Sequence, residues 1–242
     1  MKNYKIIIQY DGTPFCGWQI QKNGRTVQGV LTDALSTVLR EKITINGSGR
    51  TDTGVHAIGQ CANFRTGKVL NEREFVYSVN SILPKEISII SFVEVDFEFH
   101  PRFDARRRIY YYMISHKKSP FYFDYSMYRL VNLNIEKLNH YSNQIMGEHD
   151  FTSFAKTADQ AENKVCTVYD ARWRKSGFLT IFRIEADRFL HSMVRTIVGT
   201  LLKAHDENFH DDRITNIILS KDRTQASEAV VSKGLFLYKV IY

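Results

Sequence analysis

The feature that most constrains the fold is a pattern of elements that occurs twice along the chain. In each half an apolar strand is followed by an amphipathic helix and then by two further strands. The first run comprises residues 5–10, a helix after Thr26, and strands 43–45 and 57–64; the second comprises strand 108–115, a helix after Asn134, and strands 165–175 and 178–186. Such elements pack as antiparallel sheets covered by helices. The pattern predicts an α+β protein of two similar halves, with antiparallel sheets backed by helices.

Further elements follow from capping residues and apolar spacing. Thr26 and Asn134 are residue types that cap helices, and each precedes apolar residues spaced along one helical face. A glycine in Lys175-Ser176-Gly177 indicates a hairpin turn. We also expect helices over residues 72–83, 189–204 and 211–219, and strands over residues 87–97 and 235–241.

The two halves meet near residues 100–106, and we expect domains over residues 1–104 and 105–242. No glycine- or serine-rich linker separates them. Flexible linkers have that composition, so its absence favours one rigid body with a cleft over two tethered modules.

The charge balance narrows the class of partner. The chain has 33 Lys and Arg against 26 Asp and Glu, a net charge of +7. This balance favours a polyanionic partner, with nucleic acid first, although a merely basic globular protein has the same total. Arginines and aromatic rings are concentrated in residues 100–112, where arginines match phosphates and rings can stack on unpaired bases. The alternative is a strand with tyrosines in the core and arginines on its wet face.

The remaining composition bears on location. No window is apolar for the roughly 18 residues that a membrane-spanning helix needs, so we expect no membrane contact. Cys16, Cys61 and Cys166 are widely spaced and form no CxxC pair. They indicate neither a disulfide framework nor a zinc site, and they favour a reducing, cytoplasmic location.

The glycine-rich segment 47–57, Gly-Ser-Gly-Arg-Thr-Asp-Thr-Gly-Val-His-Ala, is the main candidate site. It places Arg50, Asp52 and His56 on a short stretch whose glycines allow sharp turns and close backbone approach. Asp52 is the best candidate for a nucleophile or base. The segment lacks the Lys-Ser/Thr ending of a phosphate-binding loop, and Asp52 stands where a dinucleotide fingerprint needs its third glycine. A metal held by Asp52 and His56 is a minor alternative.

A second candidate lies in residues 187–195. Asp187, His191 and Arg195 recur every four residues and share one face if the segment is helical. They form either a solvated face of salt bridges or a site in which Arg195 reaches Asp52 and keeps it ionised. In the strand 108–115, Tyr110 and Tyr112 point to one side and Tyr111 to the other, and alternation alone does not decide which side is core.

Taken together, the motifs closely resemble those of the TruA-type tRNA pseudouridine synthases. They lie in the family's order over nearly the whole chain. The motifs are Tyr10-Asp11-Gly12-Thr13, Gly17-Trp18-Gln19, Thr26-Val27-Gln28, residues 49–57, residues 99–105, residues 108–112, residues 149–154, residues 189–199 and Gly234-Leu235-Phe236-Leu237. The block Arg50-Thr51-Asp52-Thr53-Gly54-Val55-His56-Ala57 is the most specific.

The resemblance implies an isomerase that converts uridine to pseudouridine in tRNA, in the anticodon stem-loop at positions 38–40, with no cofactor or metal. Asp52 matches the catalytic aspartate, and Arg195 matches the arginine paired with it. Arg50 matches the arginine that helps displace the target base, and Tyr110 matches the tyrosine that stacks on that base. The family's fold is two ferredoxin-like halves with a basic cleft between them, and it works as a homodimer on tRNA.

Other residues are expected to contact the RNA without reading its sequence. Basic side chains supply such phosphate contacts. The candidates are Lys22, Arg25, Arg106, Arg107, Arg108, Lys117 and Lys118. For His56 we expect a structural or phosphate-facing role and not chemistry.

Three departures from the family pattern leave the RNA target open. Ala229-Val230-Val231 stands where Thr-Ala-Pro is usual, Tyr111 stands where arginine is common, and the chain is slightly short. A paralogue acting on another structured RNA is therefore one alternative. A non-catalytic RNA-binding protein is a second, against which the set Asp52, Tyr110 and Arg195 argues. A metal-dependent nuclease is a third alternative. It would need clustered carboxylates, and Asp52 is the one carboxylate in segment 47–57.

Overall fold

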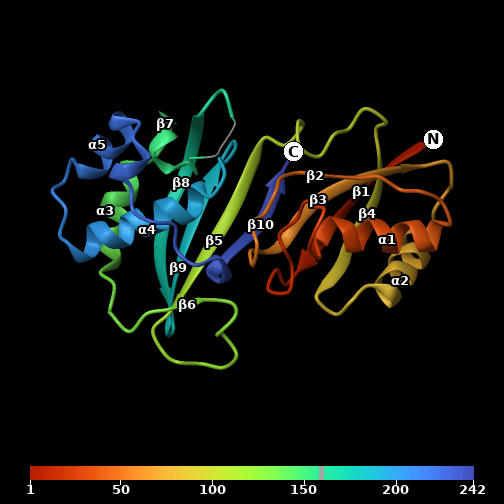
Figure 1. Ribbon diagram of the computed structural model, residues 1–242, viewed down its shortest axis with the longest axis horizontal. Helices are drawn as coiled ribbons and strands as arrows, with labels where there is room; N and C mark the ends of the chain where they lie inside the picture. The colour runs from red at the N-terminus through yellow and green to blue at the C-terminus, as the bar shows by residue number, and fades with distance from the viewer. Residues whose placement is uncertain (158–160) are drawn as a thin grey trace. The chain divides into compact units, whose positions relative to one another are not determined.

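The computed structural model describes residues 1–157 and 161–242 of the 242-residue chain. Its contacts separate into two units, of which unit 1 comprises Met1–Arg106 and Phe236–Tyr242 and unit 2 comprises Arg107–Leu235. The chain therefore leaves unit 1 after Arg106 and returns to it for its last strand. Both units combine helices with antiparallel strands, which confirms the α+β class (Figure 1).

Unit 1 has the βαββαβ succession of a ferredoxin-like unit. Its elements are β1 (Lys2–Tyr10), α1 (Val27–Leu39), β2 (Ile45–Gly47), β3 (His56–Thr66), α2 (Glu72–Ile82), β4 (Ile87–Val95) and β10 (Leu235–Ile241). Strand β1 pairs antiparallel with both β3 and β4, and β2 pairs antiparallel with β3. Strand β10 adds a parallel pairing to β3, with Phe236 opposite His56.

The local signals of unit 1 act as expected. The Thr26 side chain accepts a hydrogen bond from the backbone N–H of Gly29 and so caps α1, and Asn71 caps α2 in the same way. Beneath the helices the core is aromatic: Tyr4 stacks on Phe92 with ring centroids 4.7 Å apart, and Phe75 lies 4.5 Å from the same ring. The two helices thus cover a sheet face built from large rings.

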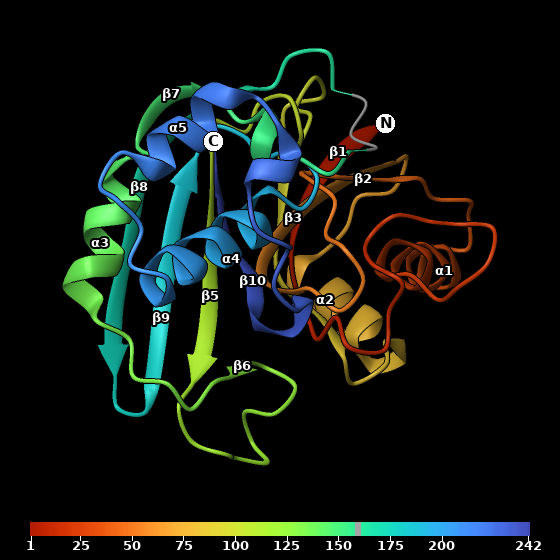
Figure 2. The ribbon, with the colours of Figure 1, turned by 60° about the vertical axis from the view of Figure 1, so that its left-hand side comes forward.

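Unit 2 repeats the order of elements. Its helices and strands are β5 (Arg107–Ser115), β6 (Met127–Tyr128), α3 (Ile135–Asn143), β7 (Gly147–Asp150), β8 (Val165–Ser176), β9 (Leu179–Ala186), α4 (Met193–Asp206) and α5 (Arg213–Ser220). The order β8-β9-β5, paired antiparallel throughout, matches the order β2-β3-β1 of unit 1. Helix α3 follows β5 as α1 follows β1, and α4 follows β9 as α2 follows β3 (Figures 1 and 2). The predicted duplication is confirmed.

The core of unit 2 joins its sheet to α3 and α4. The Trp173 indole of β8 donates to the Ser142 hydroxyl of α3 at 3.0 Å, and its ring lies 4.6 Å from that of Phe182. Asn134 caps α3 by accepting from the Lys137 backbone N–H, as its position predicted. The hairpin of β8 and β9 turns at Gly177, whose φ of +60° favours glycine.

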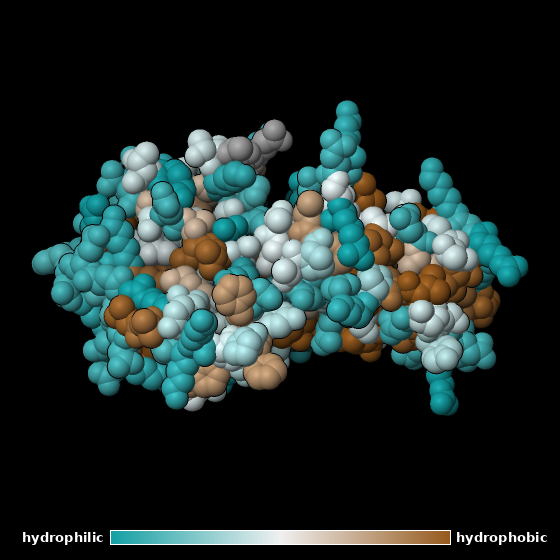
Figure 3. All heavy atoms as spheres, turned by 60° about the horizontal axis from the view of Figure 1, so that its bottom comes forward, coloured by the Kyte–Doolittle hydropathy of each residue, from teal (hydrophilic) through white to brown (hydrophobic). Residues whose placement is uncertain are grey.

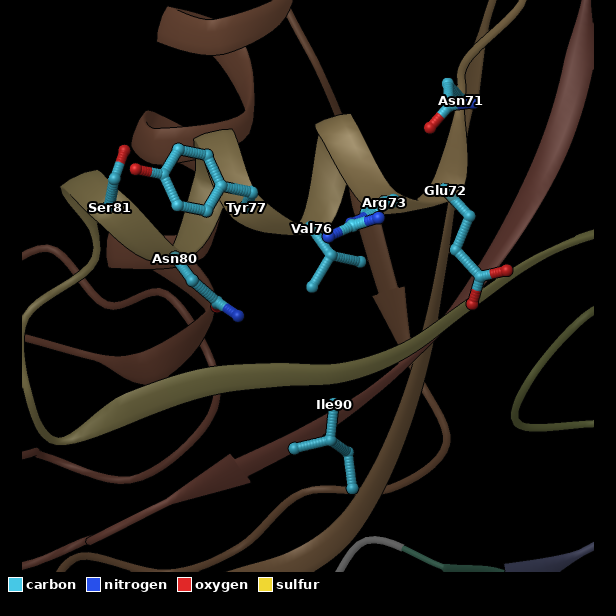
Figure 4. A pocket seen from close by; sticks show the side chains of 8 residues that line it. All are labelled: Asn71, Glu72, Arg73, Val76, Tyr77, Asn80, Ser81 and Ile90. Carbon is cyan, nitrogen blue, oxygen red and sulfur yellow. The ribbon is translucent and has the colours of Figure 1, made fainter.

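The elements differ from the sequence expectation most clearly at the start of one helix and in two short strands. The expected helix over residues 189–204 begins only at Met193, and the short strand β7, with the smaller β6, was not expected. Within residues 1–157 and 161–242, no helix is long and apolar enough to cross a bilayer. A groove along α2 is lined by residues that include Tyr77 and Asn80 of that helix and Ile90 of β4, and its lining includes none of the predicted site residues (Figure 4).

Candidate active site

In unit 1, Asp52 lies on a turn between β2 and β3, in a loop of residues 48–55. The Val55 backbone N–H donates to the Asp52 carbonyl at 3.1 Å and closes the turn. The Trp18 N–H donates to the Thr51 carbonyl at 3.1 Å, and the Tyr10 hydroxyl lies 2.7 Å from the Thr51 hydroxyl. Thr51 is buried, whereas Asp52 is half-buried. The loop backbone is therefore anchored beside a carboxylate that keeps access to solvent.

Two glycines from the connection between β1 and α1 press directly on this loop. A Cβ added to Gly12 would lie 2.0 Å from the Val55 carbonyl oxygen, and one added to Gly17 would lie 2.6 Å from that of Thr51. Real Cβ atoms do not approach backbone so closely, so both positions require glycine. Gly17 also has a φ of +85°, in the left-handed region. These contacts explain why the Tyr-Asp-Gly-Thr and Gly-Trp-Gln motifs accompany the Asp52 block.

His56 supports the same loop from inside. Its side chain is 1% exposed, and its ring stacks on Phe236 with centroids 4.7 Å apart. Its Nδ1 lies 3.1 Å from the backbone N–H of Gly12 and 3.1 Å from an Asp11 carboxylate oxygen. This placement buries the His56 imidazole among Phe236, Gly12 and Asp11, away from the protein surface.

The basic side chains predicted in unit 1 are on its surface. Arg50, Lys22, Arg25 and Arg106 are all exposed. The Arg25 guanidinium lies over the Phe15 ring, 4.8 Å from its centroid, which keeps this long side chain ordered at the surface. No group of three or more His, Cys, Asp or Glu placed to hold a metal occurs among residues 1–157 and 161–242.

In unit 2, β5 carries Tyr110, Tyr111 and Tyr112, and the structure shows which of these side chains lie in the core. Tyr110 and Tyr112 are 9% and 0% exposed, and Tyr111 is half-buried. Tyr110 meets Phe189 edge-on, with ring centroids 5.2 Å apart and planes at 86°. Arg108, also predicted to contact substrate, donates to the Asp187 carbonyl at 2.7 Å. Arg107 pairs with Glu185 at 3.0 Å. Both arginines thus make bonds within the protein.

The expectation that Asp187, His191 and Arg195 share one helical face is wrong. Helix α4 begins at Met193, after Ser192 in a left-handed conformation with φ of 60°. The Asp187 carboxylate accepts from the backbone N–H groups of Thr167 and Arg188, and the His191 carbonyl accepts from Lys156. These tertiary hydrogen bonds hold the segment outside the helix, so Arg195 alone of the three lies in α4.

Arg195 is held by the strap (residues 226–231), a segment in which the sequence marked only the departure Ala229-Val230-Val231. Its Nε donates to the Val230 carbonyl at 2.7 Å, and its own carbonyl accepts from the Val230 N–H at 3.3 Å. One turn later a Cβ on Gly199 would lie 2.2 Å from the Glu228 carbonyl oxygen. A glycine inside a helix was the available signal, since it marks close backbone approach.

The strap also receives a hydrogen bond from β5. The Tyr112 hydroxyl donates to the Val231 carbonyl at 2.9 Å. Burial raises the pKa of the Tyr112 phenol above its usual value, and the nearby positive charge of Arg195 opposes this rise in part. Tyr112 therefore stays a hydrogen-bond donor throughout the neutral range. The strap bonds Arg195 and Tyr112 through backbone carbonyls, which explains how Ala229-Val230-Val231 can stand where Thr-Ala-Pro is usual.

Comparisons with known proteins show the family to which the chain belongs. A family model described as tRNA pseudouridine synthase matches residues 6–104 and 142–242. The chain is 41% identical over 243 residues to tRNA pseudouridine synthase A of Pseudothermotoga lettingae, covering 99% of each. It is 38% identical to the protein of that name from Thermoanaerobacter sp. and 39% to that from Clostridium acetobutylicum, covering all of each chain. The chain belongs to the tRNA pseudouridine synthase family.

Proposed function

We propose that this protein converts uridine to pseudouridine in tRNA, in the anticodon stem-loop at positions 38–40. The observation that carries the proposal is the identity of 41% over 99% of both chains to a protein named tRNA pseudouridine synthase A. The net charge of +7 suits an RNA substrate. The Asp52 loop, anchored by two glycines that admit no side chain, supplies a defined carboxylate.

The reaction is an isomerisation that needs no redox partner. The N1–C1′ glycosidic bond breaks, the uracil turns, and a C5–C1′ bond forms in its place. The C5 hydrogen leaves as a proton, and N1 gains a proton, so atoms and electrons balance. The base must first leave the helical stack, at a cost of a few kcal/mol. The protein must therefore hold a flipped base and supply a group that acts at the sugar or the base.

Asp52 is proposed as that group, acting as a nucleophile or as a base on the sugar. Arg195 is proposed as its partner, because an arginine beside a carboxylate favours the ionised form. Tyr110 is proposed to stack on the uracil and to accept the C5 proton. Its edge-on contact with Phe189 supports this role, since a ring held on one side presents a stable surface to a base.

The exposed basic residues are proposed to bind the RNA backbone. Arg50, next to Asp52 on its loop, is proposed to fill the space that the flipped base leaves. Lys22, Arg25 and Arg106 are exposed and are proposed to contact phosphates. The Arg108 guanidinium already donates to the Asp187 carbonyl, so its proposed share in binding is to hold the segment before α4. His56 is proposed to support the Asp52 loop and not to touch RNA.

The test is an Asp52→Asn variant, which is nearly isosteric and removes the charge. Pseudouridine formation is measured as release of tritium from tRNA labelled at uridine C5. We expect no product above background, with RNA affinity close to that of the wild type. The control is Asp33→Asn, the same change on the exposed face of α1, which should leave turnover unchanged. Appreciable turnover by the Asp52→Asn variant would remove Asp52 from the chemistry.

A second experiment, combined with the tritium-release assay, separates the alternatives. Mapping pseudouridines in RNA from cells with and without the protein names the target position directly. Loss of sites in an RNA other than tRNA would identify a paralogue with another target. Binding of tRNA with no altered sites, and no tritium release by the wild-type protein, would identify a non-catalytic RNA-binding protein.

We also propose that the protein acts in the cytoplasm as a homodimer. The thiols Cys16, Cys61 and Cys166, which form no disulfide, suit a reducing compartment, in which tRNA is also found. The resemblance to the family supports the dimer. Sedimentation equilibrium at micromolar concentration tests it, and a mass of 28.2 kDa at every concentration would contradict it.

A further inference from the structure

The connection between β5 and β6 exposes aromatic rings that no packing requirement explains. The Phe121 and Phe123 side chains are 83% and 61% exposed. Both belong to a stretch of residues 117–125, which we call the aromatic loop. Figures 1 and 2 both show this connection extending beyond the ends of the strands of unit 2. Leaving two large rings in water forgoes the free energy of burial, so their exposure indicates a binding surface.

Packing and hydrogen bonds hold the aromatic loop in a defined conformation. The Tyr122 ring, which lies between the two exposed rings in sequence, packs edge-on against Phe178 with centroids 5.2 Å apart. The Tyr122 carbonyl accepts from the Ser126 hydroxyl at 2.7 Å and from the Tyr125 N–H at 3.2 Å. With Tyr122 anchored inward, the neighbouring rings on either side are presented outward. A surface held in this way binds without a large ordering cost.

Positive charge surrounds the exposed rings. Lys117 and Lys118 at the start of the loop are exposed, and Asp124 is the loop's one acidic residue. The Lys233 ammonium lies over the Phe123 ring, 3.8 Å from its centroid. On the face that Figure 3 brings forward, hydrophobic side chains of unit 2, brown and tan at the left, lie in small groups among hydrophilic ones in teal. Rings interleaved with cations suit single-stranded nucleic acid, whose bases stack and whose phosphates pair with lysine.

We propose that the aromatic loop binds unpaired nucleotides of the RNA substrate. Bases stack on Phe121 and Phe123, while Lys117, Lys118 and Lys233 lie near phosphates. The proposal rests on the proposed function for the identity of the substrate. RNA is favoured over a protein partner because lysine is depleted at the cores of protein interfaces. A second copy of the chain seated on the loop is the competing occupant, and the sedimentation measurement below distinguishes it from RNA.

The experiment compares three double variants at Phe121 and Phe123, changed together to Ala, Leu or Tyr. Two probes are used: a ten-nucleotide oligouridylate, and a tRNA transcript without modified nucleotides. Base stacking is worth about 1–3 kcal/mol per base, so the Ala pair should weaken oligouridylate binding about tenfold or more. The Leu pair should weaken it similarly, because leucine keeps hydrophobicity but has no π face. The Tyr pair should bind as the wild type does.

Controls separate this proposal from the others. Tyr77→Ala removes an aromatic ring that is 77% exposed on α2 and should leave oligouridylate binding unchanged. The Ala pair should also bind the tRNA transcript more weakly than the wild type, because the same rings contact its unpaired nucleotides. Melting temperatures confirm that each variant is folded.

Two results would overturn the proposal. One is equal binding of oligouridylate by the Leu pair and the wild type. The other is a change in sedimentation of the Ala pair at unchanged RNA affinity, which would make the loop an interface between copies of the chain. If the wild type releases no tritium but the Ala pair loses oligouridylate binding, the proposed function fails while the loop's role stands.

Discussion

The Asp52 loop of unit 1 and the start of α4 in unit 2 hold their charged side chains by different means. The loop backbone that carries Asp52 packs directly against the backbone of Gly12 and Gly17, and neither glycine has room for a Cβ. Arg195 is held through its side chain, whose Nε donates to the Val230 carbonyl of the strap. In unit 1 neighbouring chain segments position the turn itself, whereas in unit 2 a hydrogen bond positions the end of a flexible side chain.

The difference shows which substitutions each region can accept. Backbone pressed on backbone excludes every side chain larger than hydrogen, so the residue type itself is constrained. A carbonyl that accepts a hydrogen bond is supplied by any residue, so the strap tolerates changes of side chain provided that its path is kept. Where the strap meets Gly199, backbone again packs on backbone and the residue type is constrained to glycine. A Cβ at Gly199 would lie 2.2 Å from the Glu228 carbonyl oxygen.

The largest effect is expected for Gly12→Ala, which tests the stricter rule at the Asp52 loop. The new Cβ would lie 2.0 Å from the Val55 carbonyl oxygen, which belongs to backbone and cannot swing aside. We expect a loss of about 3 kcal/mol in the free energy of unfolding and loss of turnover. Urea unfolding and tritium release measure both. Gly67→Ala, with nothing within 4 Å of its added Cβ, is the matched control and should stay near wild type.

Wild-type stability and activity in the Gly12→Ala variant would break the comparison, because the loop would then be shown to accept a side chain. Loss of turnover at unchanged stability would sharpen it. That result would mean that the turn moves as a unit and displaces the Asp52 carboxylate without unfolding the rest of unit 1.

Much of the fold could be predicted from the sequence, because it depends on local signals. The caps Thr26 and Asn134 act on backbone N–H groups three residues away, and the hairpin at Gly177 depends on one residue with positive φ. Such short-range interactions are visible in sequence order. The duplicated α+β order followed from the same signals together with apolar spacing.

The segment 187–192 could not be predicted, because distant partners decide its conformation. Its Leu190 continues the helical spacing of Met193, Val194 and Ile197. Yet Thr167 and Lys156 donate hydrogen bonds to the segment from more than 19 residues away in sequence. The contacts of the strap could not be predicted for a related reason, although the sequence marked its Ala229-Val230-Val231 as a departure. Its part is played by the carbonyls of Val230 and Val231, and sequence patterns reveal side chains, not which carbonyl accepts a bond.

A smaller effect is expected for Gly199→Ala, which tests the strap. Alanine favours the helix by about 1 kcal/mol, but its Cβ would push the strap away at Glu228. The Val230 carbonyl would then shift from the Arg195 Nε. A misplacement of about 1 Å can cost about 10²-fold, so we expect kcat to fall about 10- to 100-fold with KM for tRNA nearly unchanged. Lys203→Ala, on the exposed side of α4, is the control and should leave kcat unchanged.

Equal falls of kcat in the Gly199→Ala and Lys203→Ala variants would contradict positioning by the strap, because the second variant leaves the strap in place. A rise in KM with constant kcat would also contradict it, since that result describes lost substrate binding.

The smallest effect is expected for Tyr112→Phe, which removes one hydrogen bond from the strap and keeps the ring. The Val231 carbonyl loses its donor, so we expect a loss of about 1 kcal/mol in the free energy of unfolding and a fall in kcat smaller than that of Gly199→Ala. Tyr128→Phe, the same change on a side chain that is 46% exposed, should cost less.

The pH dependence of that loss identifies its source. The pKa of the buried Tyr112 phenol is raised above its unfolded value of about 10, so its stabilising contribution is complete below pH 10 and declines as the pH rises further. The difference in unfolding free energy between wild type and Tyr112→Phe should therefore be constant from pH 6 to about pH 9 and shrink above about pH 10. A difference that already falls between pH 6 and pH 8 would contradict a neutral phenol as the donor. A constant difference up to pH 11 would contradict a raised pKa of the Tyr112 phenol in the folded protein.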